Sequence, residues 1–198
     1  MPVNREAAER AISDFLSALG FNPREHAELA ETPQRVTEAF SDDLLRGHGV
    51  DVPELIRKGS CAAPALALAT AGLVAVTEIA VASTCPHHLL PALGVAHVVY
   101  LPGSSLLGIG TVTALVDAFA RRLTLQEAIA HNVVTALVEH AGARGAYCEL
   151  ELEHGCLRAR GERQAQALVR SSARAGELAS RDALLEISLA LGRARGGT

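Results

Sequence analysis

Two short segments of the chain concentrate side chains that bind transition metals. Cys85, His87 and His88 lie within four consecutive residues, and His154 and Cys156 are separated by a single glycine. Zinc takes thiolate and imidazole ligands in tetrahedral geometry, and a catalytic zinc site leaves one position for water. Cys85, His88 and Cys156 therefore fit an open site with two cysteines and one histidine. Iron accepts the same mixture of nitrogen and sulfur ligands and is the alternative metal.

The two remaining histidines of these segments, His87 and His154, are free to carry protons in such a site. Imidazole suits that work because its reference pKa of about 6.5 lets it donate or accept a proton near neutral pH. Each segment alone is also consistent with ordinary packing, since cysteine is among the most frequently buried residues. The presence of both segments favours a metal site.

Gln126 and Glu127 form the next candidate pair, at the start of a predicted helix. An ionised carboxylate accepts two parallel hydrogen bonds from an N–H and an amine, the edge that guanine or a pterin presents. A glutamate in the first helical turn is also favourable beside the positive end of the helix dipole. From spacing alone, both interpretations of Glu127 remain open.

Predicted strands place both metal-binding segments at strand ends. Enrichment in β-branched residues predicts strands at residues 72–84 and 94–101, and strict alternation predicts one at residues 146–153. Residues 156–160 can pair back on the third as a further strand. The first strand ends at Cys85, and we expect His154 and Cys156 at the turn between the last two.

Helical periodicity and capping residues predict the other elements. The expected helices span residues 4–19, 32–46, 111–122, 125–141 and 180–191. Glycine, proline and serine interrupt residues 47–71, which we expect to be an irregular connector. Locally paired strands around two helices favour an α+β fold with an antiparallel sheet over a doubly wound parallel sheet. We expect residues 1–71 to be an N-terminal helical region with its connector and residues 72–198 to be the catalytic domain.

Composition limits the classes of protein to which the chain can belong. With 198 residues, of which 49% are hydrophobic and 20% charged, the chain can bury the core of one principal domain. Its net charge of −4 argues against nucleic acid or an anionic membrane as a partner. The sequence has neither a long apolar run nor a secretory signal, so we expect a cytoplasmic protein.

The segments described above resemble the GTP cyclohydrolase I family. The resemblance rests on residues 83–91, on Gln126 with Glu127 and on residues 154–161, and extends to residues 31–36 near the N-terminus. It implies the tunnelling fold, in which antiparallel sheets of several subunits close into a barrel. It also implies a ring-shaped homo-oligomer with active sites between subunits, and a small purine or pterin-like substrate.

The resemblance assigns roles to individual side chains. It matches the zinc ligands to Cys85, His88 and Cys156, the catalytic histidines to His87 and His154, and the substrate-binding residues to Gln126, Glu127 and Arg160. In the family, metal-bound water attacks carbon 8 of the purine and opens the imidazole ring. Formate is then released, and the ribose is rearranged to close a dihydropterin.

The chain departs from the family where the triphosphate is held. Gly110, Thr111 and Ala114 replace a serine, a lysine and an arginine, Thr77 replaces an arginine, and Pro86 replaces an acidic residue. Loss of two hydrogen bonds from charged groups costs about 3 to 6 kcal/mol, or roughly a hundred- to ten-thousand-fold in affinity. We therefore predict a diverged zinc-dependent cyclohydrolase whose guanine-type substrate has fewer phosphates than GTP.

Two alternatives remain. One is a conventional GTP cyclohydrolase I that forms dihydroneopterin triphosphate with a rearranged phosphate site. The other is a non-catalytic subunit that binds a purine or pterin or has a regulatory role. Retention of both His87 and His154 argues against the second alternative, because a binding protein has no evident need for proton carriers.

Overall fold

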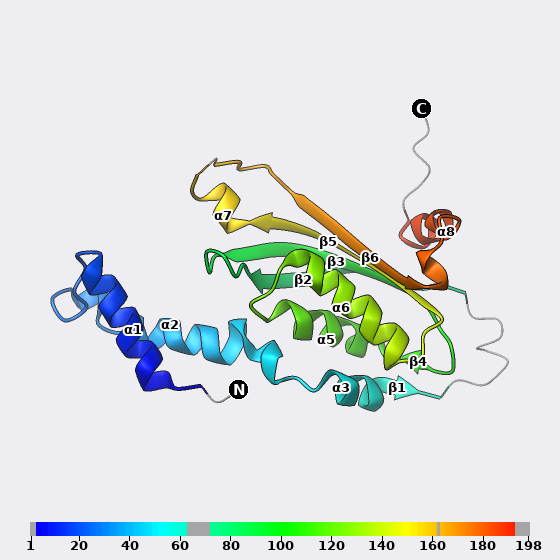
Figure 1. The fold of residues 1–198 in the computed structure, drawn as a ribbon, viewed down its shortest axis with the longest axis horizontal. Helices are drawn as coiled ribbons and strands as arrows, with labels where there is room; N and C mark the ends of the chain where they lie inside the picture. The colour runs from blue at the N-terminus through cyan, green and yellow to red at the C-terminus, as the bar shows by residue number, and fades with distance from the viewer. Residues whose placement is uncertain (1–2, 63–71, 162, 193–198) are drawn as a thin grey trace.

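A four-stranded antiparallel sheet with two helices on one face forms the centre of the protein (Figure 1). The computed structural model describes residues 3–62, 72–161 and 163–192. The sheet has the order β2-β3-β5-β6, with strands β2 (Val74–Thr84), β3 (Pro91–Leu101), β5 (Gly145–His154) and β6 (Val169–Gly176). Helices α5 (Ile109–Ala120) and α6 (Gln126–Glu139) connect β3 to β5. This strand-strand-helix-helix-strand-strand order confirms the predicted α+β class.

The core lies between the sheet and helices α5 and α6. Alternation along β5 sends Cys148, Leu150 and Leu152 into this core, where they are fully buried with Ile129 and Val133 of α6. Side chains of successive residues in a strand point to opposite faces of the sheet. The sequence prediction of this strand and of its buried face is therefore confirmed.

The N-terminal helices project beyond one end of the sheet (Figure 1). They are α1 (Arg5–Ala18), the short η1 (Ala27–Leu29), α2 (Thr32–Glu38) and the π-helical turn η2 (Ala39–Leu44). Asn4 caps α1 by accepting a hydrogen bond from the backbone N–H of Ala7, and a proline lies in the first turn of α2. Both predicted N-terminal helices are confirmed.

The predicted irregular connector is partly regular, which corrects the sequence prediction. It contains the short helix η3 (Arg46–Gly49), α3 (Val52–Gly59) and strand β1 (Ser60–Cys61), which pairs with β4 (Leu106–Leu107). Asp51 caps the start of α3 by accepting a hydrogen bond from the N–H of Glu54, and the helix buries Ile56 completely. Its two turns are too short to show a clear helical period. Residues 63–71 of the connector lie outside the described part of the chain.

The strand predicted at residues 156–160 is wrong. The chain there forms a helical turn, α7 (Gly155–Arg158), in which the N–H of Ala159 donates to the carbonyl of Gly155. The segment contains no β-branched residue to favour an extended chain. The fourth strand is β6, followed by η4 (Glu177–Ala179) and the predicted closing helix, α8 (Ala183–Ala190).

No helix within residues 3–62, 72–161 and 163–192 has both the length and the apolar composition required to span a bilayer.

Replacement of Leu150 by alanine should destabilise the fold strongly. Leu150 is 0% exposed, and removal of a buried leucine side chain typically costs about 2 to 5 kcal/mol because a cavity remains. Urea denaturation at fixed protein concentration measures the loss. Leu19→Ala, at a position that is 58% exposed, is the control and should change the unfolding free energy by less than about 0.5 kcal/mol. Equal effects of the two substitutions would contradict the assigned core.

Candidate metal centre

Strand pairing brings the two metal-binding segments to the same end of the sheet. In the β2–β3 ladder Thr84 lies opposite Pro91, and in the β3–β5 ladder Ala92 lies opposite His154. Since Pro91 and Ala92 are neighbours on β3, the residues that follow Thr84 lie beside the residues that follow His154. Cys85 and Cys156 are therefore close in space although far apart in the sequence.

A tight turn after β2 presents the first segment. The N–H of Leu89 donates to the carbonyl of Cys85 at 2.9 Å, and the N–H of Cys85 donates to the carbonyl of Leu90 at 3.0 Å. The backbone of Leu89 has a φ of 55°, in the left-handed region that residues other than glycine rarely adopt. The turn exposes both His87 and His88 at the end of the sheet.

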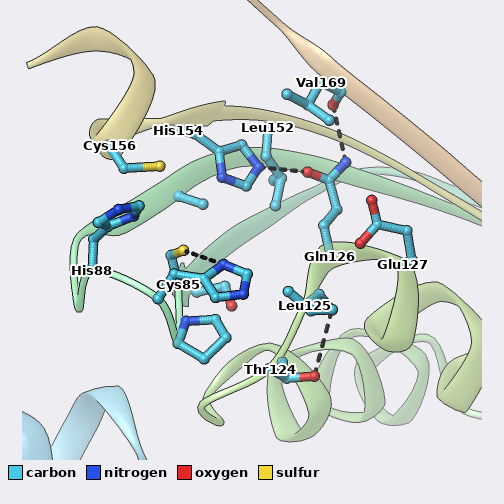
Figure 2. A pocket seen from close by; sticks show the side chains of 14 residues that line it. Cys85, His88, Thr124, Leu125, Gln126, Glu127, Leu152, His154, Cys156 and Val169 are labelled. Atoms are coloured by element: carbon cyan, nitrogen blue, oxygen red, sulfur yellow. Dashed lines mark hydrogen bonds between the residues drawn. The ribbon is translucent and has the colours of Figure 1, made fainter. Parts of the chain in front are cut away.

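A glycine allows the second segment to approach this turn. A Cβ atom on Gly155 would lie 2.9 Å from the backbone carbonyl oxygen of Pro91, closer than side chains pack. Only the absence of a side chain lets α7 begin against β3 at this point. The first turn of α7 then carries the Cys156 thiol towards Cys85 (Figure 2).

The three predicted metal ligands meet. The Sγ atoms of Cys85 and Cys156 and a ring nitrogen of His88 all lie within 4.8 Å of one another. Around a tetrahedral zinc with bonds of about 2.0–2.3 Å, such atoms are roughly 3.3–3.8 Å apart, so small side-chain movements suffice to close the site. This is the one group of metal-ligating side chains at such spacing within the described residues.

The electrostatics of the two thiols fit a site for a cation. Burial and the neighbouring Cys85 raise the pKa of Cys156, while the nearby charge of Arg160 acts in the opposite direction. The Cys156 thiol resists ionisation because its thiolate would be partly removed from water and would face the Cys85 sulfur. A divalent cation reverses that balance, since thiolate is the form that binds metal.

A pocket of about 210 Å³ joins the metal ligands to most of the other predicted residues. His87, His154, Gln126 and Glu127 all line it. Arg160 does not: it follows α7 and is exposed to solvent.

The pocket also contains two hydroxyl side chains that the sequence did not single out. They belong to Ser83, at the buried end of β2, and to Thr124, just before α6. The available indication was that each lies two residues before a predicted site residue, Cys85 or Gln126.

Gln126 and His154 are joined by a hydrogen bond inside this pocket. The Oε1 of Gln126 lies 2.8 Å from Nε2 of His154 (Figure 2). The amide nitrogen of Gln126 donates to the backbone carbonyls of Leu150, at 3.2 Å, and Val169, at 2.9 Å. Gln126 is buried, whereas the adjacent Glu127 is exposed.

Two of the five positions that depart from the expected family pattern line a separate hollow. Thr77 of β2 and Ala114 of α5 share it with Arg46, Glu78 and Asp117. The guanidinium of Arg46 lies 2.7 Å from the Asp117 carboxylate, which raises the pKa of Arg46. It also lies 3.6 Å from the carboxylate of Asp43. The arginine of this hollow is therefore already paired with carboxylates.

Comparison with known proteins decides the family. A sequence profile described as GTP cyclohydrolase I matches residues 8–191, most of the chain. The chain belongs to the GTP cyclohydrolase I family. GTP cyclohydrolase 1 of Chromobacterium violaceum is 41% identical over 156 residues, covering 79% of this chain and 72% of that protein. The same enzyme of Leifsonia xyli subsp. xyli is 36% identical over 195 residues, covering 96% of each chain.

A solved structure is also similar. The apo form of the archaeosine synthase QueF-Like aligns with 54% of this chain and 96% of its own, with a TM-score of 0.43 and 17% identity. Membership of the GTP cyclohydrolase I family rests on the sequence matches and makes the chain a member of a hydrolase family.

The four cysteines of this GTP cyclohydrolase I homologue should differ in reactivity towards a thiol reagent. Cys61 is exposed and should react in the metal-loaded protein, whereas bound metal should protect Cys85 and Cys156. A chelator should make those two reactive. Burial raises the pKa of Cys148 to about 12, so Cys148 should react only after denaturation. Counting reactive thiols before and after chelation measures the difference.

Single variants identify which thiols hold the metal. Cys85→Ser and Cys156→Ser should each abolish stoichiometric metal binding, because a site with one thiolate and one imidazole has lost a third of its protein ligands. Cys61→Ser is the matched control and should keep the full metal content, measured by elemental analysis. Retention of metal in Cys156→Ser would exclude the site described here.

Proposed function

We propose that this chain is a zinc-dependent cyclohydrolase that opens the imidazole ring of a guanine-type purine. Cys85, His88 and Cys156 hold the metal in this proposal. Its main support is the convergence of their three ligand atoms within 4.8 Å, in the pocket that His87 and His154 also line. When bound, zinc lowers the pKa of water towards about 7 and so supplies a nucleophile near neutral pH.

The two histidines supply the proton transfers. When water adds to carbon 8, a carbon–oxygen bond forms and a carbon–nitrogen bond of the imidazole ring breaks. The departing nitrogen then needs a proton, which an imidazole can donate. His87 lies on the side of the pocket that carries the metal ligands, with its Nδ1 3.9 Å from the Sγ of Cys85. His154 approaches from the end of β5 and is the second proton carrier.

Glu127 and Arg160 bind the substrate from outside the metal ligands in this proposal. Glu127 is exposed in the first turn of α6, where its carboxylate can accept two parallel hydrogen bonds from the N–H and amine edge of guanine. Arg160 is exposed beyond α7 and is available to a polar or anionic part of the substrate. Gln126, the other residue of the predicted recognition pair, is buried beside Glu127.

We further propose that the substrate carries fewer phosphates than GTP. The hollow beside Thr77 and Ala114 contains one cation, Arg46, and two carboxylates, Glu78 and Asp117. An excess of negative charge disfavours a polyphosphate. The alternative, a conventional GTP cyclohydrolase I, is favoured by relatives of that name at 41% and 36% identity.

A ring-shaped homo-oligomer with sites between subunits is part of the proposal. The outer strands of the sheet, β2 and β6, each have a strand partner on one side only within the described residues. A single bridge between Thr84 and Leu123 is the exception on the β2 side. Such edges can pair with another copy of the chain. In this proposal residues 72–198 form the catalytic unit, and residues 1–71 are its N-terminal extension.

Kinetic comparison of GTP, GMP, guanosine and guanine tests the substrate. We expect formate release with kcat/KM for GMP or guanosine at least equal to that for GTP. The basis is the loss of two charged phosphate contacts, worth roughly a hundred- to ten-thousand-fold in affinity. A hundred-fold preference for GTP, with a fluorescent pterin product, would establish the conventional enzyme instead. Metal analysis of the active protein distinguishes zinc from iron.

Alanine at His87 or His154 should abolish turnover while the metal is retained. A positioned acid or base typically contributes about a hundred-fold or more, so formate release should fall at least that far. His131→Ala, at an exposed position on α6 outside the pocket, is the control and should keep full activity. Absence of turnover in the parent protein with every purine tested would favour the non-catalytic binding subunit.

A further inference from the structure

The carboxamide of Gln126 has a hydrogen-bond partner for each of its polar groups. Gln126 is only 5% exposed, and as the first residue of α6 it lies against the ladder between β5 and β6. Its amide nitrogen donates both hydrogens, to the carbonyls of Leu150 on β5 and Val169 on β6. Buried polar groups require such partners, so this arrangement is held firmly.

The two carbonyls determine which way round the carboxamide lies. A carbonyl oxygen only accepts hydrogen bonds, so the group of Gln126 that faces Leu150 and Val169 has to be its NH₂ group. The oxygen of the carboxamide is consequently directed at His154, 2.8 Å from Nε2. Because that oxygen cannot donate, the hydrogen between the two residues belongs to Nε2 of His154.

The opposite edge of the His154 ring faces the pocket. Figure 2 shows the ring turned with Nε2 towards Gln126 and with its other nitrogen, Nδ1, towards the side where Cys85, His88 and Cys156 lie. Because Nε2 carries the hydrogen that it donates to Gln126, Nδ1 of the neutral ring carries a lone pair. It is the ring nitrogen free to exchange a proton inside the pocket.

We propose that Gln126 is a positioning residue that fixes the orientation and tautomer of His154, so that Nδ1 is the atom that transfers protons to and from the substrate. The proposal rests on the cyclohydrolase function and assigns Gln126 a different task from substrate recognition. The Nε2–H of His154 bonds to Gln126 whether or not Nδ1 carries a proton, so the ring need not turn between the two states. A donor or acceptor that keeps its orientation through the reaction saves reorganisation.

The neighbouring Glu127 has a different role. It is exposed and lines the pocket, so its carboxylate is available to a ligand. The polar atoms of Gln126 are already engaged with the protein, and a ligand would have to displace one of those bonds. Substrate recognition therefore belongs to Glu127, and positioning to Gln126.

Nitrogen NMR of the metal-loaded protein labelled with ¹⁵N-histidine tests the tautomer without any turnover. The signals of His154 are identified by their loss in His154→Ala. We expect the neutral ring of His154 to carry its proton on Nε2, with Nδ1 unprotonated. A proton on Nδ1 with a bare Nε2 would overturn the proposal, whatever the activity of the enzyme.

Gln126→Met tests the positioning role, because methionine matches the length of glutamine but has no hydrogen-bonding amide. We expect the Nε2–H signal of His154 to broaden by exchange with water, and kcat to fall at least about ten-fold with KM changed less than three-fold. Glu127→Gln should instead raise KM. Gln34→Met, at an exposed position on α2, controls for the substitution itself and should change neither constant.

The outcomes separate this proposal from the proposed function. A raised KM with unchanged kcat in Gln126→Met, or an unchanged Nε2–H signal, would show that Gln126 recognises substrate or only packs. Absence of turnover with every purine would overturn the cyclohydrolase function, while the NMR measurement would still decide the tautomer. Should Gln126→Met fail to fold, the tautomer in the unsubstituted protein remains the deciding measurement.

Discussion

The register of strand β3 between its two neighbours is the constraint on which the candidate metal centre depends. Pro91 and Ala92 occupy adjacent positions on β3 and pair with Thr84 and His154 on opposite sides. A slip of one residue in either ladder would move a ligand by about 3.3 Å, more than a zinc bond length, and would turn every side chain to the other face of the sheet. Burial of Leu150 and its neighbours opposes that slip, so core packing sets the spacing of the ligands.

The same region contains two unfavourable features that a cation at the candidate site would offset. Leu89 adopts a left-handed backbone conformation, and burial and the neighbouring Cys85 raise the pKa of the Cys156 thiol. Strained backbone persists where the surrounding structure fixes it, and it concentrates at functional sites. A metal that binds the folded chain and not the unfolded one stabilises the turn and the thiolates together. Folding of this end of the sheet and metal binding are thus expected to be coupled.

Residue types with specific chemistry were predictable from the sequence, whereas contacts to the backbone were not. Cys85, His88 and Cys156 stand out because few other roles require those side chains together. The strand of β5 was predictable because every second residue is apolar. By contrast, the partners of Gln126 are two backbone carbonyls, which every residue carries, so nothing in the sequence pointed to them. The helical turn of α7, with four residues, is too short to show a period.

Residue 111, where the family resemblance leads us to expect a lysine, takes part in the packing between α3 and α5. Thr111, at the position of the family's lysine, lies directly against Gly59 at the end of α3, where a Cβ atom would come within 1.9 Å of the threonine Oγ1. The N–H of Gly108 also donates to the carbonyl of Gly59 at 3.0 Å, so α3 and the start of α5 are in close contact. A long cationic side chain at residue 111 would have to leave this contact. Thr111 therefore contributes to helix packing. Arg46 is paired with the carboxylates of Asp43 and Asp117.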